Sequence, residues 1–424
     1  MEYKKIDCNS FNIHTIKVNR FKTTKIEVIF RNNVNKETIA INSFLASFLC
    51  ESTKKYSTRK KLAIKCEDLY KCFYYAFTNK IGDCLNTVFS LNFINPEYID
   101  EKNYLNDLIE FLFDSILNGN FNNKEADINT FNITKNNILL DIDSIEENAD
   151  KKAINNALKK MDEKSLSSLS VLGTKEDINK ITPEKLYEAY IKLLNESIVD
   201  IFVIGNTNMD NIVKLIKQYY HNHQINSKKI NYYIDNNIRK KSIKCVDKSS
   251  LSQSQLVVLY NLKNLTKDEK EITFHLLNYI LGSGGLSSKL YKYVREDNSL
   301  CYRISSMYFK YDNLLCIASS LTYDNINDAI KLIKKSIKEM QKGIFSEDDI
   351  NDAKKNMLLS LNVNKNNPNA ILASYEFNYF LGNYLINEKI DKLNAITKED
   401  IVKLANKIVD NTYYVLSEDK NERN

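Results

Sequence analysis

The sequence contains few of the residues that interrupt regular structure. Only 9 glycines and 3 prolines occur in 424 residues, so long helices and strands are expected. No apolar run reaches the 18 residues of a membrane span; the best candidate, Ile198–Gly205, has the length of a strand and contains Asp200. Residues 1–14 also lack the apolar core of a secretory signal. These absences predict a cytoplasmic protein with no membrane contact.

Neither the charge nor the cysteines indicate a special partner. Lys+Arg 60 against Asp+Glu 54 gives a net charge of +6, a mild excess for this length. No basic block with interleaved aromatics occurs, so no nucleic-acid partner is expected. The eight cysteines include no Cys-x-x-Cys pair, and they are expected to be reduced thiols that pack or are incidental.

A repeat divides the chain into two halves. The stretches KITPEKLYEAYIKLLNESIVDIFVIGN, from Lys180, and AITKEDIVKLANKIVDNTYYVLSEDK, from Ala395, both begin with Ile-Thr-x-Glu, continue as an amphipathic helix and end in a short strand. Thr182 and Thr397 are the expected N-caps. Because the copies lie about half the chain apart, a duplication is expected.

The repeat predicts three segments. Residues 1–220 form the first half, the polar stretch 221–244 is a linker, and 245–424 form the second half. Strands precede helices in pairs, which predicts an α+β fold in which each half packs helices on an antiparallel or mixed sheet, the two halves forming a clam-shell. The predicted strands are Phe11–Val18, Thr24–Phe30, Gln255–Tyr260, Arg303–Phe309 and Leu314–Leu321, and the predicted helices are Asn103–Leu117, Lys267–Leu281 and Ile326–Met340.

The most specific motif is LGSGGLSSKLYKYVREDNSLCYRISS, from Leu281 to Ser306. Its glycine loop lacks the Gly-Lys-Ser/Thr ending of a phosphate-binding loop, which argues against nucleotide binding. Taken alone, Arg295 is also compatible with a surface helix residue, and Tyr302 with a core aromatic.

The whole motif resembles the C-terminal half of the pitrilysin/insulinase family of zinc metallopeptidases, the inverzincins. The matching residues are Gly284, Gly285, Ser287, Ser288, Leu290, Arg295, Glu296, Leu300 and Tyr302. The resemblance implies that Arg295 and Tyr302 act on a substrate held by another half, by donating hydrogen bonds near the scissile carbonyl. It also implies a substrate-binding role for Gly284 and Gly285.

The zinc motif of that family is degenerate here. The family carries His-x-x-Glu-His on a helix, and this motif is followed by Gly-Thr. If Ser52-Thr53 occupies the Gly-Thr position, Ser43 and Ser47 stand at the two His positions and Ala46 stands at the Glu position. Asp141 is the only acid close to the position of the downstream ligand. The four histidines (His14, His221, His223 and His275) suggest no replacement site. The helix is therefore expected to persist because its apolar residues pack.

The resemblance implies a function in trans. We expect a non-catalytic, substrate-binding subunit of a heterodimeric zinc metallopeptidase that acts on short unfolded peptides. Zinc is expected in a partner that bears His-x-x-Glu-His, and no metal or cofactor in this chain. The stretch Lys60–Phe77 and the INPEY that follows at Ile94 resemble a bacterial branch of the family that lacks the zinc motif. The alternative is a structural or peptide-binding protein of the same fold with no proteolytic role; a homodimer also remains open.

Overall fold

The structure is a computed structural model that describes residues 1–221, 230–234, 236 and 238–418. It divides into two compact units: Met1–Asp143 with Leu169–Tyr232, and Ser144–Ser168 with the chain from Tyr233 onward. The sequence had placed all of 1–220 in the first half, whereas the structure assigns Ser144–Ser168 to the second unit. The expected linker 221–244 falls partly on residues 222–229, 235 and 237, which lie outside the described residues, and its last two residues begin a strand.

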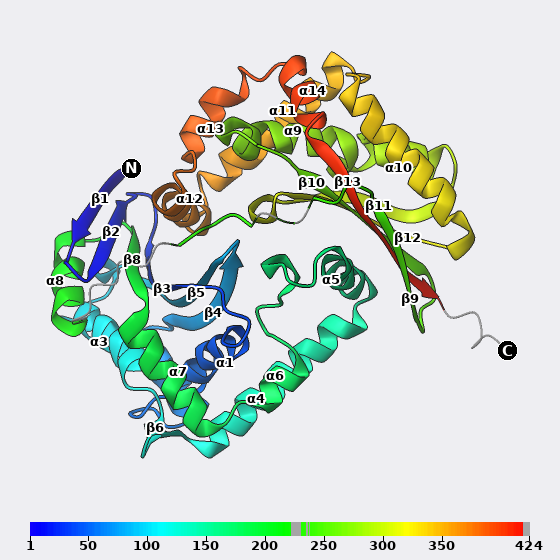
Figure 1. The fold of residues 1–424 in the computed structure, drawn as a ribbon. Helices are drawn as coiled ribbons and strands as arrows, with labels where there is room; N and C mark the ends of the chain where they lie inside the picture. The colour runs from blue at the N-terminus through cyan, green and yellow to red at the C-terminus, as the bar shows by residue number, and fades with distance from the viewer. Residues whose placement is uncertain (222–229, 235, 237, 419–424) are drawn as a thin grey trace. The chain divides into compact units, whose positions relative to one another are not determined.

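Unit 1 is built on one sheet with the strand order β1-β2-β8-β3-β5-β4 (Figure 1). The strands are β1 (Glu2–Asp7), β2 (Phe11–Lys17), β3 (Thr23–Asn33), β4 (Phe73–Ile81), β5 (Cys84–Ile94) and β8 (Ile198–Gly205). Strands β2 and β8 run parallel, and the other neighbours are antiparallel. A short hairpin, β6 (Phe121–Asn122) with β7 (Glu125–Ala126), lies outside this sheet.

Helices cover one face of this sheet and build the larger core. They are α1 (Ile39–Glu51), α2 (Arg59–Asp68), α3 (Tyr104–Leu117), α4 (Ile128–Glu147), α6 (Lys175–Asn179), α7 (Pro183–Glu196) and α8 (Met209–Tyr219). Helix α3 follows the predicted helix closely, and its residues Leu108, Ile109 and Leu112 are fully buried. Their spacing of three and four residues aligns them on one helix face, which packs into the core with α1 and β3.

Unit 2 repeats this sheet with the order β11-β12-β10-β13-β9 (Figure 1). The strands are β9 (Ile243–Ser249), β10 (Ser254–Leu262), β11 (Cys301–Phe309), β12 (Leu314–Leu321) and β13 (Ile408–Glu418). Strands β9 and β13 are parallel, and the remaining pairs are antiparallel. In place and direction, β9 therefore corresponds to β2 of unit 1, and β13 corresponds to β8. The predicted strand pair Arg303–Phe309 with Leu314–Leu321 is confirmed by β11 and β12, and the predicted strand Gln255–Tyr260 by β10.

Helices pack on both faces of the second sheet. One face carries α9 (Phe274–Asn278), α10 (Ile326–Gln341), α11 (Glu347–Asn364), α12 (Pro368–Leu381), α13 (Ile386–Leu393) and α14 (Lys398–Ala405). On the other face lies α5 (Ala149–Met161), whose residues Ala153, Ala157 and Met161 are completely buried against β10, β12 and β13. The predicted helix Lys267–Leu281 is not uniform: α9 is flanked by π-helical turns at Glu269–Thr273 and Tyr279–Ser283.

The duplication is confirmed by the two C-terminal repeats of the units. The Thr182 side chain accepts a hydrogen bond from the Lys185 N–H and caps α7, and Thr397 caps α14 in the same way. Each helix leads into the strand that occupies the same position in its sheet, β8 or β13. The α+β fold with two similar halves is therefore confirmed. No helix in the described part of the chain is long and apolar enough to cross a membrane.

Candidate functional site

Backbone geometry explains the two glycines of the predicted site. A Cβ atom on Gly284 would lie 2.6 Å from the Tyr279 carbonyl oxygen, which accepts a hydrogen bond from the Gly284 N–H at 3.0 Å. Gly285 adopts a φ of +62°, which side chains with a Cβ rarely adopt. These glycines therefore let the π-helical turn close and the chain reverse, which accounts for them without any ligand.

Arg295 lies on the short π-helical segment Tyr291–Glu296 that follows the glycine loop. This segment is fixed to α10, because Lys289 and the Tyr293 hydroxyl both bond to the Glu339 carboxylate at 2.8 Å. Burial would raise the pKa of Glu339, but the bonds from Lys289 and Tyr293 hold it below its ordinary value. π-Helical turns are frequent at functional sites because they displace side chains from the regular helical spacing.

The structure brings Arg295 and Tyr302 together. The Arg295 guanidinium carbon lies 5.4 Å from the centre of the Tyr302 ring and 4.7 Å from that of Tyr291, distances typical of cation–π contact. Tyr302 is 75% exposed, so the alternative that it is a core aromatic is wrong. The register between β11 and β12 shifts between Cys301 and Arg303, so Tyr302 stands on a β-bulge. Bulges re-aim side chains, and this one directs Tyr302 to solvent.

The degenerate zinc positions are closed by packing and hydrogen bonds. They lie on α1, where Phe44, Leu45, Phe48 and Leu49 are fully buried, as expected of a helix retained for its packing. The Ser43 hydroxyl is buried, donates to the Val171 carbonyl and pairs with the Thr78 hydroxyl at 2.6 Å. Both hydrogen-bonding roles of Ser43 are thus filled by this chain.

The residues around Ser43 do not fit zinc. Ala46 is buried and has no ligand atom, Ser47 is half-buried with a hydroxyl that is a poor zinc ligand, and Asp141 is exposed on α4. In the described residues, no group of three or more His, Cys, Asp or Glu could hold a metal ion. Of the histidines considered, His275 is exposed on α9, and His223 lies outside the described residues.

A buried charge network in unit 1 was not anticipated. Asp200 of β8 accepts hydrogen bonds from Asn12 at 3.0 Å, from His14 at 3.2 Å and from Arg31 Nε at 3.0 Å. Burial would raise the pKa of Asp200, but the His14 and Arg31 contacts hold it below its ordinary value. The Tyr3 hydroxyl lies 2.8 Å from His14 Nδ1, so both ring nitrogens of His14 have a polar partner in unit 1. The sign of this network in the sequence was Asp200, a single acid within an apolar strand.

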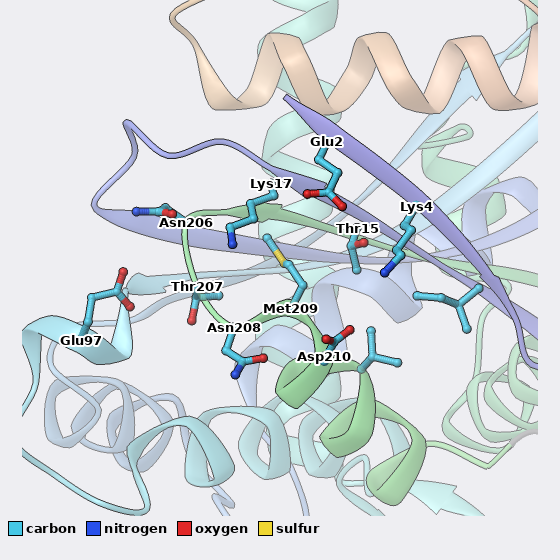
Figure 2. A pocket seen from close by; sticks show the side chains of 12 residues that line it. Glu2, Lys4, Thr15, Lys17, Glu97, Asn206, Thr207, Asn208, Met209 and Asp210 are labelled. Atoms are coloured by element: carbon cyan, nitrogen blue, oxygen red, sulfur yellow. The ribbon is translucent and has the colours of Figure 1, made fainter.

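A surface cavity of about 510 Å³ lies between β1, β2 and the start of α8 (Figure 2). Figure 2 shows Glu2, Lys4, Lys17 and Asp210 around it, with both signs of charge. These four side chains are exposed, and the first turn of α8 is already capped by Asn208, which accepts from the Asn211 N–H. Such a lining is typical of a solvated surface, and the cavity contains none of the predicted site residues.

Comparison with known proteins agrees with this arrangement. The sequence profile of the family described as "Peptidase M16 inactive domain" matches residues 180–357. The chain is 24% identical over 422 residues, 95% of each protein, to a probable inactive metalloprotease, YmfF, of Bacillus subtilis. Its fold matches that of a conserved protein from Enterococcus faecalis with a TM-score of 0.93 at 24% identity, over 98% of this chain and 99% of the other. A peptidase M16 inactive domain from Pseudomonas fluorescens matches with a TM-score of 0.80 at 15% identity, over 99% of each chain.

Residues 180–357 match the M16 inactive-domain family, and over almost its whole length the chain is similar to proteins of that class. With its duplicated fold and its glycine loop followed by Arg295 and Tyr302, the chain resembles a degenerate pitrilysin-type protein that lacks the His-x-x-Glu-His zinc motif. The residues at the zinc positions of α1 agree with the description of the matching family and of YmfF as inactive.

Proposed function

We propose that this chain is the substrate-binding subunit of a heterodimeric zinc metallopeptidase that acts on short unfolded peptides. A partner that bears His-x-x-Glu-His supplies zinc and the base. This chain supplies Arg295 and Tyr302, whose donors stabilise the charge that develops on the scissile carbonyl oxygen.

The contact of half-buried Arg295 with exposed Tyr302 is the observation that carries the proposal. A purely structural chain gains nothing from a tyrosine that is 75% exposed on a bulge with a guanidinium 5.4 Å from its ring. The stack orients the guanidinium, because it fixes one face of the group while its N–H edge remains able to donate. Pre-oriented donors are the feature that stabilises developing negative charge most effectively.

The edge of the first sheet supports peptide binding. Among the described residues, β4 pairs only with β5, so no further strand pairs with its outer edge. An extended peptide can add to such an edge through main-chain hydrogen bonds, which select for flexibility more than for sequence. Beside this edge, the rings of Phe73, Tyr75 and Phe77 form a row with centre separations of 5.0 and 5.9 Å. These rings favour peptides with apolar side chains.

The test is a peptidase assay with the full chain and a homologue that bears His-x-x-Glu-His, each alone and together. We expect the mixture to cleave flexible fluorogenic peptides and this chain alone to be inactive. In the mixture, Arg295→Ala and Tyr302→Phe should each lower kcat/KM by about 10²–10³-fold, the usual effect of losing one such donor. Lys292→Ala, an exposed residue one turn from Arg295, and Tyr323→Phe are the matched controls and should retain the wild-type rate.

Each other outcome rejects a defined part of the proposal. A mixture that forms and cleaves equally well with both variants removes the role of Arg295 and Tyr302. A mixture that stays inert favours the structural or peptide-binding alternative. Zinc binding and cleavage by this chain alone would show that the register on α1 is wrong.

A further inference from the structure

Two cysteines meet where α2 turns into β4. Helix α2 ends at Asp68, and the next residues reverse the chain through left-handed conformations at Tyr70 and Lys71, with φ of 55° and 57°. The Cys72 N–H then donates to the Cys66 carbonyl at 3.1 Å. Standard bond lengths limit the separation of the two Cα atoms to about 7 Å or less across this bond, and disulfides join Cα atoms that are about 4.4–6.8 Å apart.

The side chains of Cys66 and Cys72 also affect each other. Each of these two thiols is the largest influence on the pKa of the other, which indicates that they lie close to one another. Cys66 is partly exposed, whereas Cys72 is 4% exposed. An accessible thiol beside a shielded one is the arrangement of an attacking and a resolving cysteine.

We propose that Cys66 and Cys72 are a reversible dithiol that closes to a disulfide by exchange with a low-molecular-weight disulfide. This reaction is independent of the proposed peptidase role and involves neither Arg295 nor Tyr302.

The step balances with one co-reactant. The Cys66 thiolate attacks a sulfur of the small disulfide, forms a mixed disulfide and releases one small thiolate. The Cys72 thiol then loses its proton and attacks the Cys66 sulfur, which forms the Cys66–Cys72 bond and releases the second small thiol. The protein loses two protons and two electrons, and the small disulfide takes them up and is reduced to two thiols.

The order of attack follows from the acidity of the two thiols. The nearby Cys72 thiol lowers the pKa of Cys66, although burial acts in the opposite direction. The Cys66 thiol, together with burial, raises the pKa of Cys72. Because the thiolate is the nucleophile, Cys66 reacts first. Burial raises the pKa of nearby Cys50 to about 12, so Cys50 does not compete.

Formation of the Cys66–Cys72 disulfide would constrain the start of β4, the edge strand of the first sheet. Phe73, the first residue of β4, follows Cys72 directly. A bond from Cys72 to the last turn of α2 would therefore hold the left-handed turn and the start of β4 in one conformation. We expect slower amide exchange at Leu69 and Cys72 in the oxidised protein than in the reduced one.

The experiment titrates the full-length protein with mixtures of reduced and oxidised glutathione, quenches in acid, and then traps all free thiols with N-ethylmaleimide in denaturant, because several of the cysteines are buried in the folded protein. Intact mass should fall from eight maleimide adducts to six, and peptide mapping should find one cross-link, between Cys66 and Cys72. Cys66→Ser and Cys72→Ser should each retain seven adducts, whereas the control Cys245→Ser should still lose two on oxidation.

The wild-type peptide map decides the proposal even if a variant fails to fold. Eight adducts throughout the titration would overturn it. So would a stable glutathione adduct on Cys66 that Cys72 does not resolve, or a cross-link that includes Cys50.

Discussion

Helix α1 of unit 1 and the Gly284–Tyr302 element of unit 2 differ in what their polar side chains contact. On α1 the residues at the zinc positions are small, and the one with a buried hydroxyl is bonded to Thr78 and Val171. In unit 2 the arginine and tyrosine stand on a π-helical segment and a bulge, with the tyrosine exposed.

This difference separates the features of the fold that packing explains from those that packing does not explain. The apolar face of α1 is needed for the core whether or not a metal is bound. A bulged, exposed tyrosine beside an arginine adds nothing to a core, so packing does not account for it. The first region should therefore respond to mutation through stability, and the second through activity.

The largest effect on stability should come from the apolar face of α1. Phe48→Ala removes a fully buried ring that contacts Phe121 at a centre separation of 5.1 Å. A cavity of this kind costs about 3–5 kcal/mol of unfolding free energy, measured by urea denaturation. Phe73, 63% exposed on β4, is the control, and Phe73→Ala should change the unfolding free energy by about 0.5 kcal/mol or less. Equal losses for both variants would contradict a packing role specific to α1.

Low pH should destabilise the folded protein through protonation of Asp200. Its carboxylate has a lowered pKa in the folded state, so the unfolded chain binds the proton more readily. The stability that Asp200 contributes is fully present above about pH 4, its ordinary range, and is lost as pH falls through the lowered value. Urea unfolding across pH 2–7 should therefore show a steep acid loss that Asp200→Asn reduces. The exposed control Asp210→Asn should keep the wild-type profile; an unchanged profile for Asp200→Asn would refute the assignment.

A smaller effect should distinguish the two serines of α1. Ser43→Ala removes a buried hydroxyl and leaves the Val171 carbonyl without that donor, which costs about 1–3 kcal/mol. Ser47→Ala changes a half-buried position and should stay within about 0.5 kcal/mol. Thermal and urea unfolding of both variants provide the measurement. If Ser47→Ala proved the more destabilising of the two, a stabilising role for the hydrogen bonds of the Ser43 hydroxyl would be wrong.

The smallest effect on stability should come from the Arg–Tyr pair. Arg295→Ala and Tyr302→Phe should each change the unfolding free energy by about 1 kcal/mol or less, because the ring is exposed and the contact is a surface cation–π stack. Together with the loss of kcat/KM proposed above, this would separate activity from stability. A loss of several kcal/mol would instead indicate a structural role for the pair.

Much of the fold followed from periodicity in the sequence. Helix α3 and strands β11 and β12 were found because their apolar residues recur at intervals of three and four or of two. The duplicated helix-and-strand repeat was visible because both copies carry the same capping threonine. The site was identified by resemblance, since spacing alone left Tyr302 compatible with a core aromatic.

The features that the sequence did not reveal depend on partners distant along the chain. The bulge at Tyr302 is defined by pairing with β12, and the environment of Asp200 is defined by Asn12 and Arg31 on other strands. Helix α5 was missed because its apolar face is made largely of alanines among lysines and asparagines. Its place became clear only with β10, β12 and β13 beside it.

The membership of α5 in unit 2 means that the second unit is discontinuous in sequence. A fragment that begins at residue 245 would lack Ala153, Ala157 and Met161, and the sheet residues Val257, Leu259 and Tyr414 would lose their cover. An exposed apolar sheet face of this kind promotes aggregation. A gene split at the midpoint of the repeat would therefore yield an insoluble second half, whereas co-expression with a piece that spans Ser144–Ser168 should rescue its solubility.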